Sequence, residues 1–182
     1  MKNSLLFIAF VIIIGCSKIE PRRPINPKPS TTLFKEAIDE SKKINKTEDL
    51  KIAELIKKDS TNFYIQSSSG FWYTYIYKIE EVLPTPKKGD EVLISYTISD
   101  LNDSIIYNTK DLGLKKYKID KEDFISGLQK GIKLMKTGET ITFVLPFYNA
   151  FGIIGDGKKI GINKSIKSTV TLIKITNLKW EH

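Results

Sequence analysis

Histidine and cysteine are almost absent from this chain. Its 182 residues include one histidine, His182 at the C-terminal end, and one cysteine, Cys16. A Ser-His-Asp triad or a Cys-His pair needs a histidine within a folded core, so nucleophilic catalysis of those kinds is excluded. A zinc site and an intrachain disulfide are excluded by the same scarcity. We therefore expect neither a metal nor a cofactor.

Glycine and proline are too scarce for a low-complexity protein. The chain has 11 glycines and 7 prolines, while 41% of it is hydrophobic and 10% aromatic. This composition can form an ordinary core. Lysine and arginine number 29 against 21 acidic residues, which gives a net charge of +8. The basic residues are spread along the chain and are not grouped with stacking aromatics, so we expect no nucleic-acid partner.

The N-terminus has the pattern of an export signal. Lys2 precedes an almost purely apolar run over residues 5–14, which is long enough for a signal peptide but shorter than the ~20 residues of a membrane span. The glycine and Cys16 that follow resemble the lipobox of bacterial lipoproteins. That resemblance implies cleavage after residues 1–15 and acylation of Cys16, so that several acyl chains anchor the protein to a membrane.

The residues after Cys16 predict a tether and a location. Ser17, rather than an aspartate, follows the cysteine, and no acidic run comes next. By resemblance to enterobacterial sorting rules, this favours the outer membrane and a position facing the periplasm. Residues 16–30 contain four prolines and few large apolar side chains, so we expect a semi-extended tether there.

Residues 31–60 have helical periodicity. Apolar residues recur at helical spacing in two stretches, which predicts two helices with a break after Asn45 and with Thr47 as the N-cap of the second. The sequence leaves three roles open for this extension. It could pack on the following domain, pair with another copy of the chain, or hold the domain away from the membrane.

The pattern beyond residue 60 changes to an alternation of period two, which is typical of strands. The stretch Phe124 to Met135 is the exception, because its apolar residues recur every three or four positions before Gly138. It predicts a short amphipathic helix against a sheet, within one α+β domain over residues 61–182. The alternation predicts strands over residues 71–77, 91–98, 105–107, 139–145 and 168–175, with turns at 84–90 and 100–104.

Several blocks of this domain resemble one known family. Residues 88–96 (Lys-Gly-Asp-Glu-Val-Leu-Ile-Ser-Tyr) resemble its opening strand, and residues 124–139 resemble its helix signature, with Gly127, Gly131 and Gly138-Glu139 in place. Residues 146–152 (Pro-Phe-Tyr-Asn-Ala-Phe-Gly) resemble its Pro-x-x-x-Ala-Tyr-Gly segment. In this order and spacing, Pro84 to Lys179 resembles the FKBP-type peptidyl-prolyl cis-trans isomerase domain.

The resemblance implies a fold and an activity. The expected fold is an antiparallel sheet curled around one short helix and preceded by the two N-terminal helices. With the lipobox and the segment 67–73, the chain is most similar to the gliding-motility-associated FKBP lipoproteins of the GldI type. The implied partners are proline-containing polypeptides, including envelope proteins for motility or secretion.

Isomerisation of an X-Pro bond requires no nucleophile, metal or cofactor. The barrier is ~18–20 kcal/mol because amide resonance must be broken. A dry aromatic pocket removes water from the amide carbonyl and so favours the twisted state. The alternative is that the same aromatics are simply core. By resemblance, the pocket consists of Tyr96, Tyr107, Asn108, Tyr117, Phe124, Ile125, Leu128, Phe151 and Ile160, with the Ile125 backbone N–H holding a substrate carbonyl.

The chain departs from the family pattern at several pocket positions. Phe151 stands where a tyrosine is usual, Asn108 where an aspartate is common, and Leu128 in place of the tryptophan of the pocket floor. These departures concern turnover rather than fold. They leave two functions open: an exported, lipid-anchored isomerase and folding factor for envelope proteins, or a catalytically weak or inactive FKBP-like scaffold or chaperone.

Residues 152–157 are glycine-rich but lack a β-α-β context, so we interpret them as a flap rather than a phosphate loop.

Overall fold

The computed structural model describes residues 31–176, with side chains from residue 34 onward. The predicted signal peptide (1–15), the predicted lipidation site at Cys16 and the tether (16–30) lie outside the described residues, and so do residues 177–182. No helix within the described range combines the length and the apolar character that a membrane span requires.

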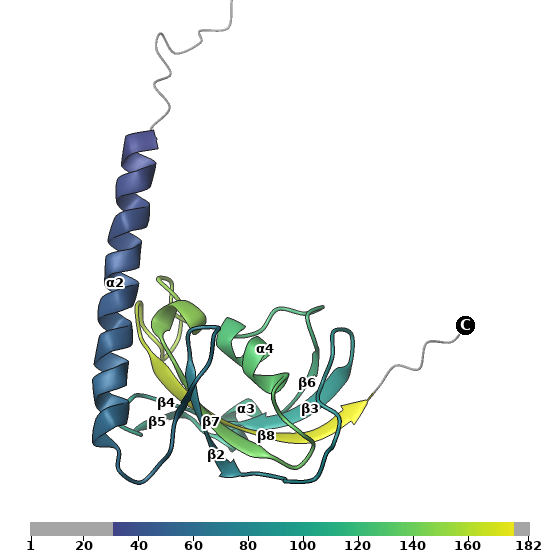
Figure 1. Cartoon of the computed structure of the whole chain (residues 1–182). Coiled ribbons are helices and arrows are strands. Elements are labelled where there is room, and N and C mark those ends of the chain that lie inside the picture. The colour runs from purple at the N-terminus through teal and green to yellow at the C-terminus, as the bar shows by residue number, and fades with distance from the viewer. Residues whose placement is uncertain (1–30, 177–182) are drawn as a thin grey trace, which may run out of the picture. The chain divides into compact units, whose positions relative to one another are not determined.

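The described chain begins with one continuous helix, α2 (Thr31–Lys58) (Figure 1). The predicted break after Asn45 is wrong, and Thr47 does not cap a second helix. Its hydroxyl instead donates to the carbonyl oxygen of Lys43 at 2.9 Å, one turn earlier. A threonine that bonds back in this way can remain inside a helix. The chain divides into two compact units at residues 39 and 40, within α2, and the side chains of residues 34–39 in the first unit are exposed.

An antiparallel sheet forms most of the second unit. Its strands are β1 (Ile65–Gln66), β2 (Trp72–Tyr77), β3 (Glu91–Tyr96), β4 (Ile98–Ser99), β5 (Ile105–Tyr107), β6 (Leu114–Lys118), β7 (Thr140–Leu145) and β8 (Ile166–Thr176). Their order is β1-β2-β7-β8-β3-β6, while β4 pairs with both β5 and β8. The sheet and its helices make the FKBP-like α+β fold that the sequence predicts.

Two strand predictions need correction. The strand expected over residues 91–98 is divided at Thr97, whose N–H leaves the β3 register and donates to the carbonyl of Thr169 at 3.0 Å. Strand β6 was not predicted from the sequence. Three of its five residues are lysines, and Tyr117 is its only buried side chain, so the strand shows little apolar alternation.

The short helix α4 (Ser126–Ile132) lies close against strand β7 because it carries two glycines. A Cβ at Gly131 would lie 2.5 Å from Cε1 of Phe143, and a Cβ at Gly127 would lie 2.6 Å from Cδ2 of Leu145. Both distances are below any real contact, so only glycine fits. Leu128 is fully buried in the resulting core. The predicted helix is confirmed, although it is shorter than its apolar stripe.

Within the second unit, the C-terminal half of α2 packs on the sheet. Ile52 is fully buried and packs with Trp72 and Val144. The Asp49 carboxylate accepts a hydrogen bond from the Tyr148 hydroxyl at 2.5 Å. Of the three roles left open for the helical extension, this part of it serves the first, because it packs on the domain that follows.

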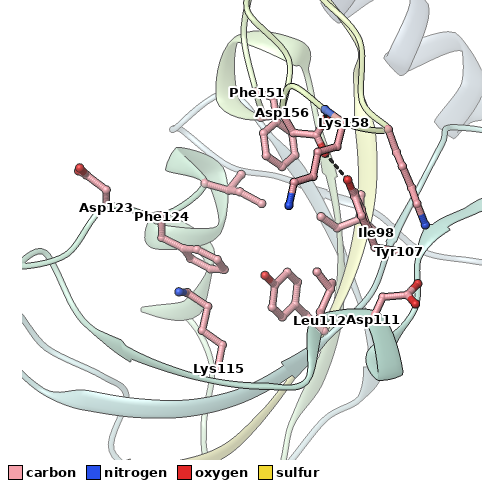
Figure 2. Close-up of a pocket in the computed structure, with 14 residues that line it drawn as sticks. Ile98, Tyr107, Asp111, Leu112, Lys115, Asp123, Phe124, Phe151, Asp156 and Lys158 are labelled. Carbon is pink, nitrogen blue, oxygen red and sulfur yellow. Dashed lines mark hydrogen bonds between the residues drawn. The ribbon is translucent and has the colours of Figure 1, made fainter.

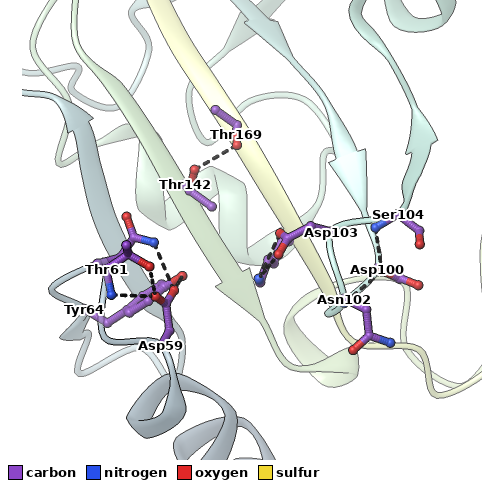
Figure 3. A network of polar contacts seen from close by, with 11 residues as sticks. Asp59, Thr61, Tyr64, Asp100, Asn102, Asp103, Ser104, Thr142 and Thr169 are labelled. Carbon is purple, nitrogen blue, oxygen red and sulfur yellow. Dashed lines mark hydrogen bonds and ion pairs between the residues drawn. The ribbon is translucent and has the colours of Figure 1, made fainter.

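The turn after α2 is held by the Asp59 carboxylate, which accepts hydrogen bonds from Thr61, Asn62 and Tyr64 (Figure 3). The hydroxyl of Thr61 is the leading cause that lowers the pKa of Asp59 well below its ordinary value. Burial, and then Asp59, raises the pKa of Tyr64 to about 12. The polar groups of this turn are therefore satisfied by one another.

Candidate active site

A pocket of about 710 Å³ lies among strands β3 to β6, the start of α4 and the loop after β7 (Figure 2). This volume falls in the range of ligand-binding sites, about 300–1,000 Å³. The short helix α3 (Thr109–Leu112) supplies part of one wall. The lining residues are Tyr96, Ile98, Tyr107, Asp111, Leu112, Lys115, Asp123, Phe124, Ile125, Ala150, Phe151, Asp156, Lys158 and Lys159.

Five residues predicted from the sequence line this pocket: Tyr96, Tyr107, Phe124, Ile125 and Phe151. The rings of Tyr96 and Phe124 meet edge to face with centroids 5.5 Å apart. Burial raises the pKa of the Tyr96 phenol above its ordinary value. The phenol therefore stays neutral, and these five residues offer apolar and aromatic surface to the pocket.

Three other predicted residues lie behind the walls instead of lining them. Tyr117 is fully buried, and its ring supports the Phe124 ring at a centroid distance of 5.2 Å. Leu128 is fully buried, and Ile160 is 3% exposed. Leu128 does not line the pocket, because its side chain is fully buried in the core beside the close contact of α4 with β7. These residues hold the lining in place.

Asn108 is not in the pocket wall either. Its side-chain oxygen accepts hydrogen bonds from the backbone N–H groups of Lys110 and Asp111, while the Asp111 carboxylate accepts one from the Asn108 N–H. This reciprocal capping box starts α3. The side chain is therefore occupied by the helix N-terminus, which is why it does not face a ligand.

Sequence reasoning missed the remaining lining residues. A signal existed for Ile98, because it follows Tyr96 at a spacing of two and both side chains are buried. No comparable signal existed for Lys115, Lys158 and Lys159, since lysines occur throughout the chain. Only the folded structure brings these three to one pocket.

Tyr107 and Asp156 join strand β5 to the flap. The Tyr107 hydroxyl donates to Oδ2 of Asp156 at 2.5 Å, and Oδ1 accepts from the N–H groups of Lys158 and Ile160, each at 2.8 Å. The bond to Asp156, followed by burial, raises the pKa of Tyr107. Burial alone would raise the pKa of Asp156, but the hydrogen bonds from Tyr107 and the two N–H groups together lower it. Near neutral pH, the tyrosine is neutral and the aspartate is ionised.

The backbone N–H of Ile125 makes no hydrogen bond to any described residue. The Ile125 carbonyl, in contrast, accepts a bond from the Gln129 N–H at 2.9 Å and so begins α4. A free donor among aromatic walls can bind a carbonyl oxygen while an apolar ring fills the pocket. The arrangement is suited to binding a peptide segment with an apolar ring in the pocket and its carbonyl group on the Ile125 N–H.

A sheet packed on one short glycine-bearing helix, with an aromatic pocket beside that helix, defines the FKBP class of folds. Residues 84–173 match the family model of the FKBP-type peptidyl-prolyl cis-trans isomerases. Residues 84–173 are therefore an FKBP-type peptidyl-prolyl cis-trans isomerase domain, the class of enzyme that acts on proline-containing polypeptides.

Solved structures have the same fold. A peptidyl-prolyl cis-trans isomerase from Pseudomonas syringae is 18% identical with a TM-score of 0.59, and the match covers 75% of this chain and 96% of that one. FkpA from Escherichia coli is 20% identical with a TM-score of 0.60, and the match covers 98% of this chain and 84% of FkpA. At these identities, the likeness concerns the fold alone.

Proposed function

We propose that this isomerase is a folding factor of the cell envelope, anchored through Cys16 and facing the periplasm from the outer membrane. The apolar run over residues 5–14 and the lipobox-like cysteine support export and lipidation, and Ser17 supports the outer membrane. Its clients are exported proline-containing polypeptides. The likeness to GldI-type lipoproteins supports clients in gliding or secretion machinery.

The proposed mechanism rests on one observation: an open pocket with aromatic walls next to an unpaired backbone donor. A prolyl ring would lie between Tyr96, Phe124 and Phe151, with the preceding carbonyl near the Ile125 N–H. The walls exclude water from that carbonyl. Water stabilises the planar, resonant amide more than the twisted one, so desolvation favours the twisted transition state. None of these side chains acts as an acid or a base.

A second function is favoured by Phe151. Its ring faces the pocket (Figure 2) but has no hydroxyl with which to bond a substrate. Under this alternative, the pocket docks proline-bearing segments while the protein serves as a scaffold or chaperone with weak or no turnover.

Proline-limited refolding of an exported protein separates the two functions. We expect the full chain, purified in detergent, to accelerate the slow phase. Phe151→Asp should abolish the acceleration, because a carboxylate in the pocket attracts the water that the mechanism excludes. Phe63→Asp is the matched control, since Phe63 is 83% exposed and does not line the pocket. An unchanged slow phase with reduced aggregation would favour the scaffold.

Membrane attachment has its own test. Cells grown with a palmitate analogue should label the unmodified chain and place it in the outer-membrane fraction. The variant Cys16→Ser should be unlabelled and leave that fraction. Equal labelling of both chains, or recovery of the unmodified chain among unanchored periplasmic proteins, would contradict the anchor.

A further inference from the structure

Three lysines reach the pocket, and none forms an ion pair with a described residue. The Lys115 ammonium lies 5.2 Å from the centroid of the Phe124 ring. The Lys159 ammonium lies 4.8 Å from the centroid of the Tyr107 ring and donates to the Ile106 carbonyl at 3.2 Å. Lys158 is exposed and directly follows the flap. Two of the ammonium groups thus lie over the aromatic rings of the pocket itself.

The carboxylates that line the pocket form no ion pair with these lysines. Asp156 is bound to Tyr107 and to two backbone N–H groups. Asp111 accepts the Asn108 N–H within the capping box of α3. The Asp123 carboxylate points away from the pocket in Figure 2. The three lysines and three aspartates of the lining balance in formal charge, but no ammonium group is held in an ion pair with a described carboxylate. The ammonium groups are therefore available to a carboxylate of a bound peptide.

The lysines approach from two sides. Lys115 belongs to strand β6, while Lys158 and its neighbour Lys159 directly follow the flap, between β7 and β8. Figure 2 shows Lys115 and Lys158 on opposite sides of the aromatic walls. A peptide whose proline occupies the pocket would extend in both directions beneath these ammonium groups.

We propose that this pocket selects prolines that have an acidic residue as an immediate neighbour in the peptide. This selectivity deepens the proposed function and rests on it. Opposite charges attract more strongly beside the low-dielectric walls of a pocket than in open water. A glutamate next to the bound proline would pair with an ammonium group that no described carboxylate of the protein already pairs with, whereas a lysine there would be repelled.

The selectivity can be measured with short peptides that contain one proline and have glutamate, glutamine or lysine before it or after it. Exchange NMR gives kcat/KM for isomerisation by the full chain in detergent, and titration gives the Kd of each peptide. Exposed ion pairs contribute little binding energy and buried ones contribute more. We therefore expect kcat/KM for the glutamate peptide to exceed that for the glutamine peptide by about threefold to fivefold at the favoured position. The lysine peptide should have a lower kcat/KM than the glutamine peptide. The difference should shrink between about 20 mM and about 500 mM salt.

Charge-reversal variants assign the effect to the lysines. Lys115→Glu and the double variant Lys158→Glu with Lys159→Glu should each weaken or reverse the preference at the side they face. The control Lys174→Glu makes the same charge change at an exposed position of β8 outside the pocket, so the preference should persist there.

Equal kcat/KM and equal Kd for glutamate and glutamine peptides would overturn the selectivity, as would a preference that survives every reversal at the pocket. Failure of the proposed function looks different, because no peptide would then be isomerised. In that case the Kd values still decide: tighter binding of glutamate peptides supports the acidic preference, and equal binding overturns it.

Discussion

At the residue scale, the pocket combines a free backbone donor with one polar pair that fixes the flap. Ile125 has a φ of −54° and a ψ of 119°, so its N–H is not part of the α4 hydrogen-bond ladder. The Tyr107–Asp156 bond joins β5 to the flap. The pocket therefore combines aromatic walls with polar and charged groups at defined positions.

Removing the Ile125 donor should reduce activity without reshaping the backbone. Proline requires a φ near −65°, which is close to the −54° of Ile125. We expect Ile125→Pro to lower kcat/KM by about threefold to tenfold relative to Ile125→Ala, which loses the same side chain but keeps the N–H. Equal values for the two variants, with matching melting temperatures, would show that the N–H does not bind substrate.

Restoring the hydroxyl that the family usually has at position 151 should raise turnover. One hydrogen bond contributes about 0.5–1.5 kcal/mol, so Phe151→Tyr should increase kcat/KM by about twofold to tenfold in the peptide assay. An unchanged rate would mean that the missing hydroxyl does not limit this enzyme.

The pH profile should be flat near neutrality. The pKa of Asp156 is lowered below its ordinary 3.8, and the pKa of Tyr107 is raised above its ordinary 10.0. Neither group titrates between about pH 5 and about pH 9, so kcat/KM should be constant there. Because the folded pKa of Asp156 lies below its unfolded value, its contribution to stability is complete above 3.8 and is lost as pH falls through the folded pKa. A carboxyl resonance of Asp156 that titrates above pH 5 would contradict this assignment.

At the element scale, the close contact of α4 with β7 places the start of the helix beside the pocket. Gly127 and Gly131 permit this contact, and the helix then buries Leu128 and presents Ile125. The position of the donor therefore depends on two glycines that do not line the pocket.

A methyl group on this helix should destabilise the domain. Gly131→Ala should lower the free energy of unfolding by about 1–3 kcal/mol, because overpacking against Phe143 outweighs the better helix propensity of alanine. Gly161→Ala is the matched control, since a Cβ there meets nothing within 4 Å and should change stability by about 0.5 kcal/mol or less. Chemical denaturation of both variants measures the difference; a Gly131→Ala protein as stable as the parent would refute the close contact.

At the scale of the whole molecule, the sequence predicts the fold better than the pocket. Alternation of apolar and polar residues predicts β2 and β7, and the apolar residues spaced three or four apart from Phe124 onward predict α4. Both patterns arise because one face of each element is buried. Asn108 and Leu128 were placed in the pocket wall by the sequence, but the first is held by hydrogen bonds at the start of α3 and the second is buried in the core. The three lysines of the pocket could not be predicted from the sequence, because β6 and a loop far from it in the sequence bring them together.

The most direct test of the central claim is exchange NMR on a short proline peptide with and without the full chain. The account predicts cis–trans exchange that accelerates in proportion to enzyme concentration and returns to the uncatalysed rate in Phe151→Asp, while Phe63→Asp remains active. Exchange at the uncatalysed rate in the presence of the folded, unmodified chain would contradict it.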